Sequence, residues 1–289
     1  MSKVIVVTDS NSGITQIQSK ELGVVVLPMP FYIDNEMYYE DIDLTQEQFY
    51  EKLTQGGEIK TSMPLVGDVT DKWDELLKEY DEIVYIPMSS GLSNSCSAAK
   101  AMALEYDERV FVVDNHRISV TQRLSVMKAR QLANWDIDGK EICKRLEKEA
   151  YNASIYVSVN TLEFLKKGGR ITPAAATIGT VLNIRPVLSI QGEKLESFAK
   201  VRGSMKRCEE KMISACKNDL LTRFPKVQKH QVHIGAAGAG LSQQESSQWV
   251  KILEQNFPGI EVIYNPLTAS ITTHTGPGAV GIGITIDID

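Results

Sequence analysis

Short apolar runs alternate with helix-like segments through the first half of this 289-residue chain. The runs, rich in β-branched residues, cover residues 4–7, 24–27, 83–86 and 110–113. Continuous apolar runs of this length are typical of strands buried on both faces of a parallel sheet. The intervening residues 45–53, 69–80 and 95–105 have helical character, and Thr45 with Gln48 forms a capping-box pattern. This order predicts a parallel α/β domain with right-handed crossovers, which binds ligands beyond the carboxyl ends of its strands.

The second half of the chain predicts a different kind of sheet. Strands are expected at residues 155–159, 186–190, 195–199, 232–235, 261–264 and 281–288. Helices are expected at residues 173–182, 204–221 and 243–256, and a charged helical segment at 135–151 joins the two halves. The order of these elements predicts a mixed α+β sheet. We therefore expect two domains, residues 1–155 and 156–289.

Composition limits the function classes. The formal net charge of −6 argues against nucleic acid as a main partner. The longest apolar run, residues 22–33, contains two prolines and is shorter than the roughly 20 apolar residues of a membrane span. The first apolar run is too short for a signal peptide. The four cysteines form no C-x-x-C pair, which favours reduced, buried thiols. We expect a cytoplasmic protein with no transmembrane segment, metal or cofactor.

Two glycine-containing stretches suggest a site for a small acidic group. The first runs from Gly168-Gly169-Arg170 to Pro173, where Thr172 can cap a helix. Backbone N–H groups and a guanidinium meet there, which suits an anion. In the helix that follows, Gly179 indicates either an approaching ligand or close helix packing. The second stretch is His274-Thr275-Gly276-Pro277-Gly278, a turn that is rigid at the proline and places an imidazole in polar surroundings.

Two hydroxyl-rich loops add further candidates. Thr61-Ser62 precedes Met63-Pro64, and on its own this segment is more typical of an ordinary loop. Residues 89–95 carry several serines between a strand and a helix, so their hydroxyls either donate to an oxyanion or cap the helix. Asp9-Ser10 at the end of the first strand is more typical of a turn cap.

Other kinds of site are poorly supported by the sequence. No G-x-S-x-G elbow accompanies the Ser, His and Asp residues of a hydrolase triad. His230 and His233 would point to opposite faces of a strand, so they could not chelate a metal together. The glycine-rich residues 235–240 lack the third glycine of a dinucleotide loop and the G-K-[ST] ending of a phosphate loop.

Taken in order along the chain, these segments resemble those of the DegV family. The resemblance rests on Asp9-Ser10, Thr61-Ser62-Met63-Pro64, Ser89-Ser90-Gly91-Leu92-Ser93, Gly168-Gly169-Arg170-Ile171, Asn183-Ile184-Arg185-Pro186, Lys200-Val201-Arg202-Gly203 and His274-Thr275-Gly276-Pro277-Gly278. It covers essentially the whole chain. The glycine-glycine-arginine stretch and the His-x-Gly-Pro-Gly stretch are specific in combination.

The resemblance implies a bacterial carrier that binds a long-chain fatty acid in a cleft between its two domains. Carried over to this chain, the fatty acid carboxylate would be bound by Thr61, Ser93 and His274, with Ser62 and Arg170 supporting these contacts. The bound fatty acid would be the only ligand, and the chain would have no catalytic residues of its own.

The resemblance further implies a separate kinase that phosphorylates the bound acid for phospholipid synthesis. Arg170 and Arg202 are candidate docking residues for that kinase, although a charged surface is more often merely solvated. A transient membrane contact is compatible with this role. The alternative is a stand-alone, hydrolase-like enzyme that uses Ser93 and His274 on an apolar acid or ester.

Overall fold

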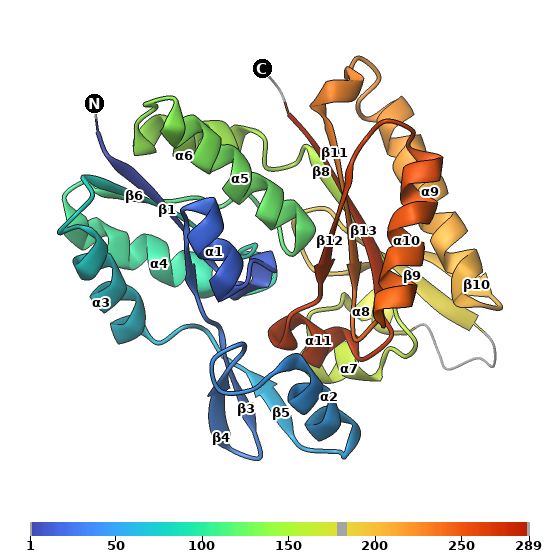
Figure 1. The fold of residues 1–289 in the computed structure, drawn as a ribbon. Helices are drawn as coiled ribbons and strands as arrows, with labels where there is room; N and C mark the ends of the chain where they lie inside the picture. The colour runs from blue at the N-terminus through green and yellow to red at the C-terminus, as the bar shows by residue number, and fades with distance from the viewer. Residues whose placement is uncertain (1, 178–183, 288–289) are drawn as a thin grey trace. The chain divides into compact units, whose positions relative to one another are not determined.

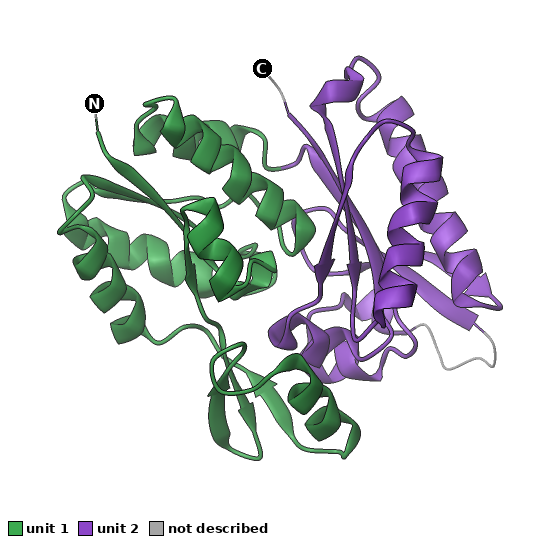
Figure 2. Cartoon of the chain, in the orientation of Figure 1, with its two compact units in different colours: residues 1–150 green, residues 151–289 purple. Residues whose placement is uncertain are grey.

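The computed structural model describes residues 2–177 and 184–287 and forms two compact units, Met1–Ala150 and Tyr151–Asp289 (Figures 1 and 2). The predicted boundary at residue 155 would cut through strand β8 (Ala153–Ser158). This strand belongs wholly to the second unit, because Ala153 already pairs with Thr285 there. The division therefore falls before β8.

A four-stranded parallel sheet forms the centre of the first unit. Its strands are β1 (Val4–Asp9), β2 (Val25–Leu27), β6 (Glu82–Ile86) and β7 (Val110–Val112), in the order β2-β1-β6-β7. Each neighbouring pair is parallel, as the alternation of strands and helices in the sequence predicts.

Helices cover both faces of this sheet. On one face lie α3 (Val66–Leu76) and α4 (Ser95–Ala103), followed by a 3-10 turn (Leu104–Tyr106). On the other lie α1 (Gln16–Leu22), α5 (Val120–Asn134) and α6 (Gly139–Lys148) (Figure 1). Along β1, Val4 and Val6 pack on the second face, while Ile5 and Val7 pack on the first. Burial on both sides explains why this strand is apolar throughout.

The first unit also contains a small antiparallel sheet that the sequence analysis did not anticipate. Its strands are β3 (Pro30–Ile33), β4 (Glu36–Tyr39) and β5 (Ile59–Thr61), in the order β4-β3-β5. Helix α2 (Gln46–Thr54) follows β4 in the chain and packs Phe49 edge-on against Phe31 of β3. This sheet positions Thr61, whose backbone is paired with Phe31.

The second unit contains the predicted mixed sheet. Its strands are β8, β9 (Ile184–Ile190), β10 (Glu196–Arg202), β11 (Val232–Gly238), β12 (Val262–Pro266) and β13 (Val280–Ile286). The order is β10-β9-β8-β13-β11-β12, with β11 and β12 parallel and the other neighbours antiparallel. Strand β10 is an edge strand with mostly exposed side chains.

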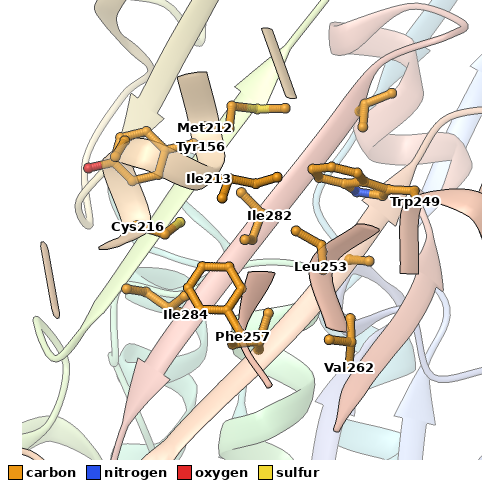
Figure 3. Close-up of a cluster of buried hydrophobic side chains, with 14 of the residues drawn as sticks. Tyr156, Met212, Ile213, Cys216, Trp249, Leu253, Phe257, Val262, Ile282 and Ile284 are labelled. Carbon is orange, nitrogen blue, oxygen red and sulfur yellow. The ribbon is translucent and has the colours of Figure 1, made fainter. Parts of the chain in front are cut away.

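The main core of this unit lies between the sheet and two long helices, α9 (Met205–Thr222) and α10 (Gln243–Asn256). Figure 3 shows side chains of both helices meeting those of the strands, including Met212, Trp249 and Ile282. The Trp249 indole N–H donates to the Gly281 carbonyl at 2.9 Å, so the largest side chain of this core has its polar group satisfied.

Three short helices, α7 (Glu163–Gly168), α8 (Pro173–Ala176) and α11 (Ala269–Thr275), complete the second unit (Figure 1). Thr172 caps α8 as predicted, since its Oγ1 accepts the Ala175 N–H at 3.3 Å. The rest of the helix predicted to end at residue 182, with Gly179, lies outside the described residues. No described helix of the chain is long and apolar enough to span a membrane.

Candidate functional site

The two glycine-containing motifs that lie far apart in the sequence are adjacent within the second unit. Helix α7 ends at Gly168, and α11 packs against it and carries His274 in its last turn. A Cβ added to Gly168 would lie only 2.0 Å from His274 Nδ1, so the imidazole ring rests directly on the backbone of α7. The structure therefore joins the candidate histidine to the glycine-glycine-arginine motif.

The sequence predicted that His274 lies on a turn, but the structure places it on helix α11. The turn begins one residue after the helix, at Gly276, whose φ of 72° is left-handed. A Cβ at Gly276 would lie 2.5 Å from the Phe164 ring of α7, so this glycine also permits the close approach of the two helices. Pro277, in the turn after α11, is bonded to a residue outside this helix: its carbonyl accepts the Asn160 side-chain N–H at 3.1 Å.

The glycines before Arg170 do not act as the predicted anion cradle. Gly169 has a left-handed backbone with φ of 71°, and its N–H donates to the Leu165 carbonyl at 3.0 Å, which closes α7. The Arg170 guanidinium donates to the Gly168 carbonyl at 2.5 Å. Arg170 and His274 thus converge on the same glycine.

The environment of His274 favours the neutral imidazole. Burial, and after it the positive charge of the nearby Arg170 guanidinium, lower the pKa of His274 from its ordinary 6.5 to about 4. The ring is therefore an uncharged hydrogen-bonding group at neutral pH, and Arg170 supplies the permanent charge. The histidine of a hydrolase triad is oriented by a carboxylate and needs a pKa near its working pH. The surroundings of His274 disfavour that alternative.

In the first unit, Thr61 and Ser62 lie where β5 ends. Both side chains are half-buried, and the Ser62 N–H donates to the Pro30 carbonyl at 3.2 Å. The pairing of β5 with β3 therefore continues one residue past the strand. After them, Met63 and Leu65 are exposed apolar residues that lead into α3.

Ser93 lies in the loop between β6 and α4, at the carboxyl end of the parallel sheet, as expected. Its Oγ accepts the Ser95 N–H at 3.2 Å, but the N-cap residue of α4 is Asn94 and not one of the serines. A hydroxyl that accepts in this way still has its own hydrogen to donate. The Ser93 hydroxyl can therefore still donate to an oxyanion, which is one of the two interpretations of this loop.

Asp9 has a larger role than a turn cap. Its side chain is fully buried at the end of β1 and accepts N–H groups from Met88, Asn11 and Gln122 at 2.8, 3.0 and 3.0 Å. Burial raises the pKa of Asp9 above 3.8, against the effect of these hydrogen bonds. Through Met88, the carboxylate fixes the start of the loop that carries Ser93.

The two candidate docking arginines lie at opposite ends of β10. The Arg170 carbonyl accepts the N–H of Leu195, just before the strand, while Arg202 is its last residue. At about 3.3 Å per residue, roughly 20 Å of backbone separates these positions. A partner that contacts both arginines would therefore lie along much of this edge strand.

Nothing among the described residues forms a group of three or more His, Cys, Asp or Glu side chains suited to a metal ion. His230 lies in a 3-10 turn (Lys229–Gln231) rather than on a strand, and His233 lies on β11 with its Nε2 3.0 Å from an Asp287 carboxylate oxygen. His233 is thus engaged in a surface contact at the end of the sheet.

A family model described as "Uncharacterised protein, DegV family" matches residues 3–287. The chain belongs to the DegV family. Protein DegV of Bacillus subtilis is 28% identical over 282 residues, covering 96% of this chain and 98% of the relative. The family resemblance found in the motifs is confirmed over almost the whole length.

Solved structures of DegV proteins share the fold. A DegV family protein from Thermus thermophilus, described by its fatty acid binding, matches with a TM-score of 0.87 and 28% identity over 99% of this chain and 100% of its own. DegV from Bacillus subtilis, described as a fatty acid binding protein, matches with a TM-score of 0.85 and 27% identity over 99% of this chain and 100% of its own. The predicted fold class is confirmed by these matches.

In this DegV chain, the first glycine of the glycine-glycine-arginine motif differs from what the sequence pattern indicates. The pattern suggested backbone donors at Gly168, whereas the structure shows that its missing Cβ leaves room for the His274 ring. A glycine inside a helix just before a second, helix-ending glycine was the available signal, because only the second is needed to end the helix.

Proposed function

We propose that this DegV protein binds a long-chain fatty acid, with the carboxylate held by Thr61, Ser93 and His274. The observation that carries the proposal is the full-length match to DegV structures whose descriptions name fatty acid binding. Two further features support it: His274 is a neutral donor at neutral pH, and the Ser93 hydroxyl has a hydrogen to donate.

The chemistry of these groups suits a carboxylate on an apolar tail. A buried carboxylate requires hydrogen-bond donors, and two hydroxyls with one imidazole N–H supply three. Arg170, beside His274, adds a fixed positive charge that favours the ionised acid. The tail then supplies most of the affinity, at about 0.8 kcal/mol for each buried CH₂.

Fatty acid affinity of three single variants tests this assignment. Thr61→Ala, Ser93→Ala and His274→Ala should each weaken binding of oleate by roughly tenfold, since each removes one hydrogen bond to a charged group. Thr54→Ala, which removes a hydroxyl from the end of α2, is the matched control and should bind as the native protein does. Unchanged affinity in one of the three variants would remove that residue from the site.

We further propose that the chain presents the bound acid to a separate kinase rather than acting as an enzyme itself. The basic side chains along the β10 edge support such a docking surface, because Lys200 and Arg202 are both exposed there. The spacing of Arg170 and Arg202 favours a partner that contacts this edge over roughly 20 Å. Kinase-dependent formation of an acyl phosphate would then require a second protein and a nucleotide.

Charge reversal tests the docking surface. Arg202→Glu should reduce acyl phosphate formation at low salt while leaving oleate affinity unchanged, because complementary charge mainly sets the association rate. Lys251→Glu, on an exposed position of α10, is the matched control. Full acyl phosphate formation by the Arg202→Glu protein would contradict the proposal, as would turnover of an ester by the purified protein alone.

A further inference from the structure

Gly168 leaves a space in α7 that the ring of His274 fills. A Cβ at this position would lie 2.0 Å from Nδ1, 2.8 Å from Cε1 and 3.1 Å from Cγ of the imidazole. The first two distances are far inside van der Waals contact, and the close-packed interior has no room to absorb them. Any side chain at position 168 must therefore displace the ring.

The backbone itself does not require a glycine at this position. Gly168 is helical and is absent from the residues with left-handed φ, whereas the next residue, Gly169, has φ of 71°. Glycine is the least favourable residue inside a helix apart from proline, and alanine the most favourable. The advantage of glycine at position 168 thus comes from the ring that lies against it.

Arg170 converges on the same residue. Its Nη1 donates to the Gly168 carbonyl at 2.5 Å, and its charge acts on the nearby imidazole. The Cα of Gly168 therefore lies against the neutral His274 ring, and its carbonyl accepts a hydrogen bond from the Arg170 cation. The Gly276–Phe164 contact brings α11 close enough to α7 for this arrangement to form.

We propose that Gly168 is a positioning residue: its bare Cα seats the His274 ring beside Arg170, so that both groups are directed at the same ligand carboxylate. The inference rests on the proposed fatty acid site and adds to it a residue that never touches the ligand. A larger residue at position 168 would weaken binding only through the displaced imidazole.

A double-mutant cycle separates this role from a general structural one. Gly168→Ala should weaken oleate binding by roughly tenfold, about as much as His274→Ala. In the His274→Ala background the added methyl meets no ring, so Gly168→Ala should cause no further loss. That double variant also relieves the collision, so it can be compared with His274→Ala even if Gly168→Ala alone folds poorly.

The histidine ring signals give a second measurement. In Gly168→Ala, NMR titration of the free protein should show the His274 pKa rising from about 4 toward the ordinary 6.5, because the displaced ring becomes more hydrated. Gly67→Ala is the control: this glycine of α3 has no atom within 4 Å of a Cβ, so oleate affinity and the His274 pKa should not change.

The outcomes distinguish the two proposals. Native affinity in His274→Ala would refute the assignment of His274 to the carboxylate site. Weakened binding in His274→Ala with native affinity in Gly168→Ala would leave that assignment intact and overturn the positioning role. A further tenfold loss when Gly168→Ala is added to His274→Ala would also overturn it, because Gly168 would then act independently of the ring.

Discussion

His274 is subject to opposing influences on its charge. It lies in the last turn of α11, where the helix dipole favours a cation by roughly 0.3–1 kcal/mol. Burial and Arg170 act in the other direction and lower the pKa of His274 to about 4, a change equivalent to about 3 kcal/mol. Desolvation and the guanidinium therefore prevail. The residue serves as a neutral donor in a position that would otherwise favour the imidazolium.

This balance predicts a pH-dependent stability. The unfolded chain binds a proton at His274 near pH 6.5, whereas the folded chain binds it only near pH 4. The contribution of the neutral His274 to the free energy of unfolding is therefore complete above pH 6.5. It is lost as the pH falls from 6.5 to about 4. Over this window the native protein should lose up to about 3 kcal/mol relative to His274→Gln.

Urea unfolding of both ligand-free proteins across this pH range measures the effect. The difference between the two curves isolates His274, because the buried Asp9 and the other titrating groups are common to both proteins. If the free energies of unfolding of the two proteins changed with pH in parallel, the imidazole would not be held in the neutral form.

The starts of helices are among the elements that local sequence determines. Thr45 and Gln48 form the predicted capping box at α2: Thr45 Oγ1 accepts the Gln48 N–H at 3.3 Å, and the Gln48 side chain accepts the Thr45 N–H at 2.9 Å. Because this pattern is contained within four residues, it can be recognised without knowledge of the tertiary structure.

We expect Thr45→Ala to lower the free energy of unfolding by about 1 kcal/mol. The Gln48 N–H loses its acceptor, and the reciprocal bond from the Thr45 N–H to the Gln48 side chain is weakened. Thermal or urea unfolding of the purified variant measures this loss. Thr54→Ala provides the comparison, since its hydroxyl only bonds back to carbonyls of its own helix. Equal stability of the two variants would argue against a stabilising cap at Thr45.

Helix α11 shows why other elements could not be predicted. Its sequence, Ala269 to Thr275, is rich in β-branched residues, which favour strands and loops over helices. The helix is stabilised instead by contacts distant in sequence, as α11 packs on α7 through Gly168 and Gly276. Local preference therefore indicated a turn at His274, and tertiary packing overrode it.

At the scale of the whole chain, strands were more predictable than the site. The apolar runs indicated the strands of the parallel sheet and of the mixed sheet, but not those of the small antiparallel sheet, because burial on one or both faces leaves a periodic pattern. The convergence of His274 and Arg170 on Gly168 leaves no such pattern, since it depends on two short helices that are distant in the sequence. The family resemblance supplied the candidate residues of the site, and the structure supplied the reason for the glycines.

The proposed function is the binding of a long-chain fatty acid. A ligand that binds only the folded chain should stabilise it by mass action. The central claim is therefore that the protein carries such an acid.

Native mass spectrometry of the freshly purified protein, followed by lipid extraction, tests this claim most directly. We predict a stoichiometric increment in mass that is identified after extraction as a long-chain fatty acid and is diminished in His274→Ala. A protein that is purified empty, and remains empty after incubation with a panel of saturated and unsaturated long-chain acids, would contradict the account.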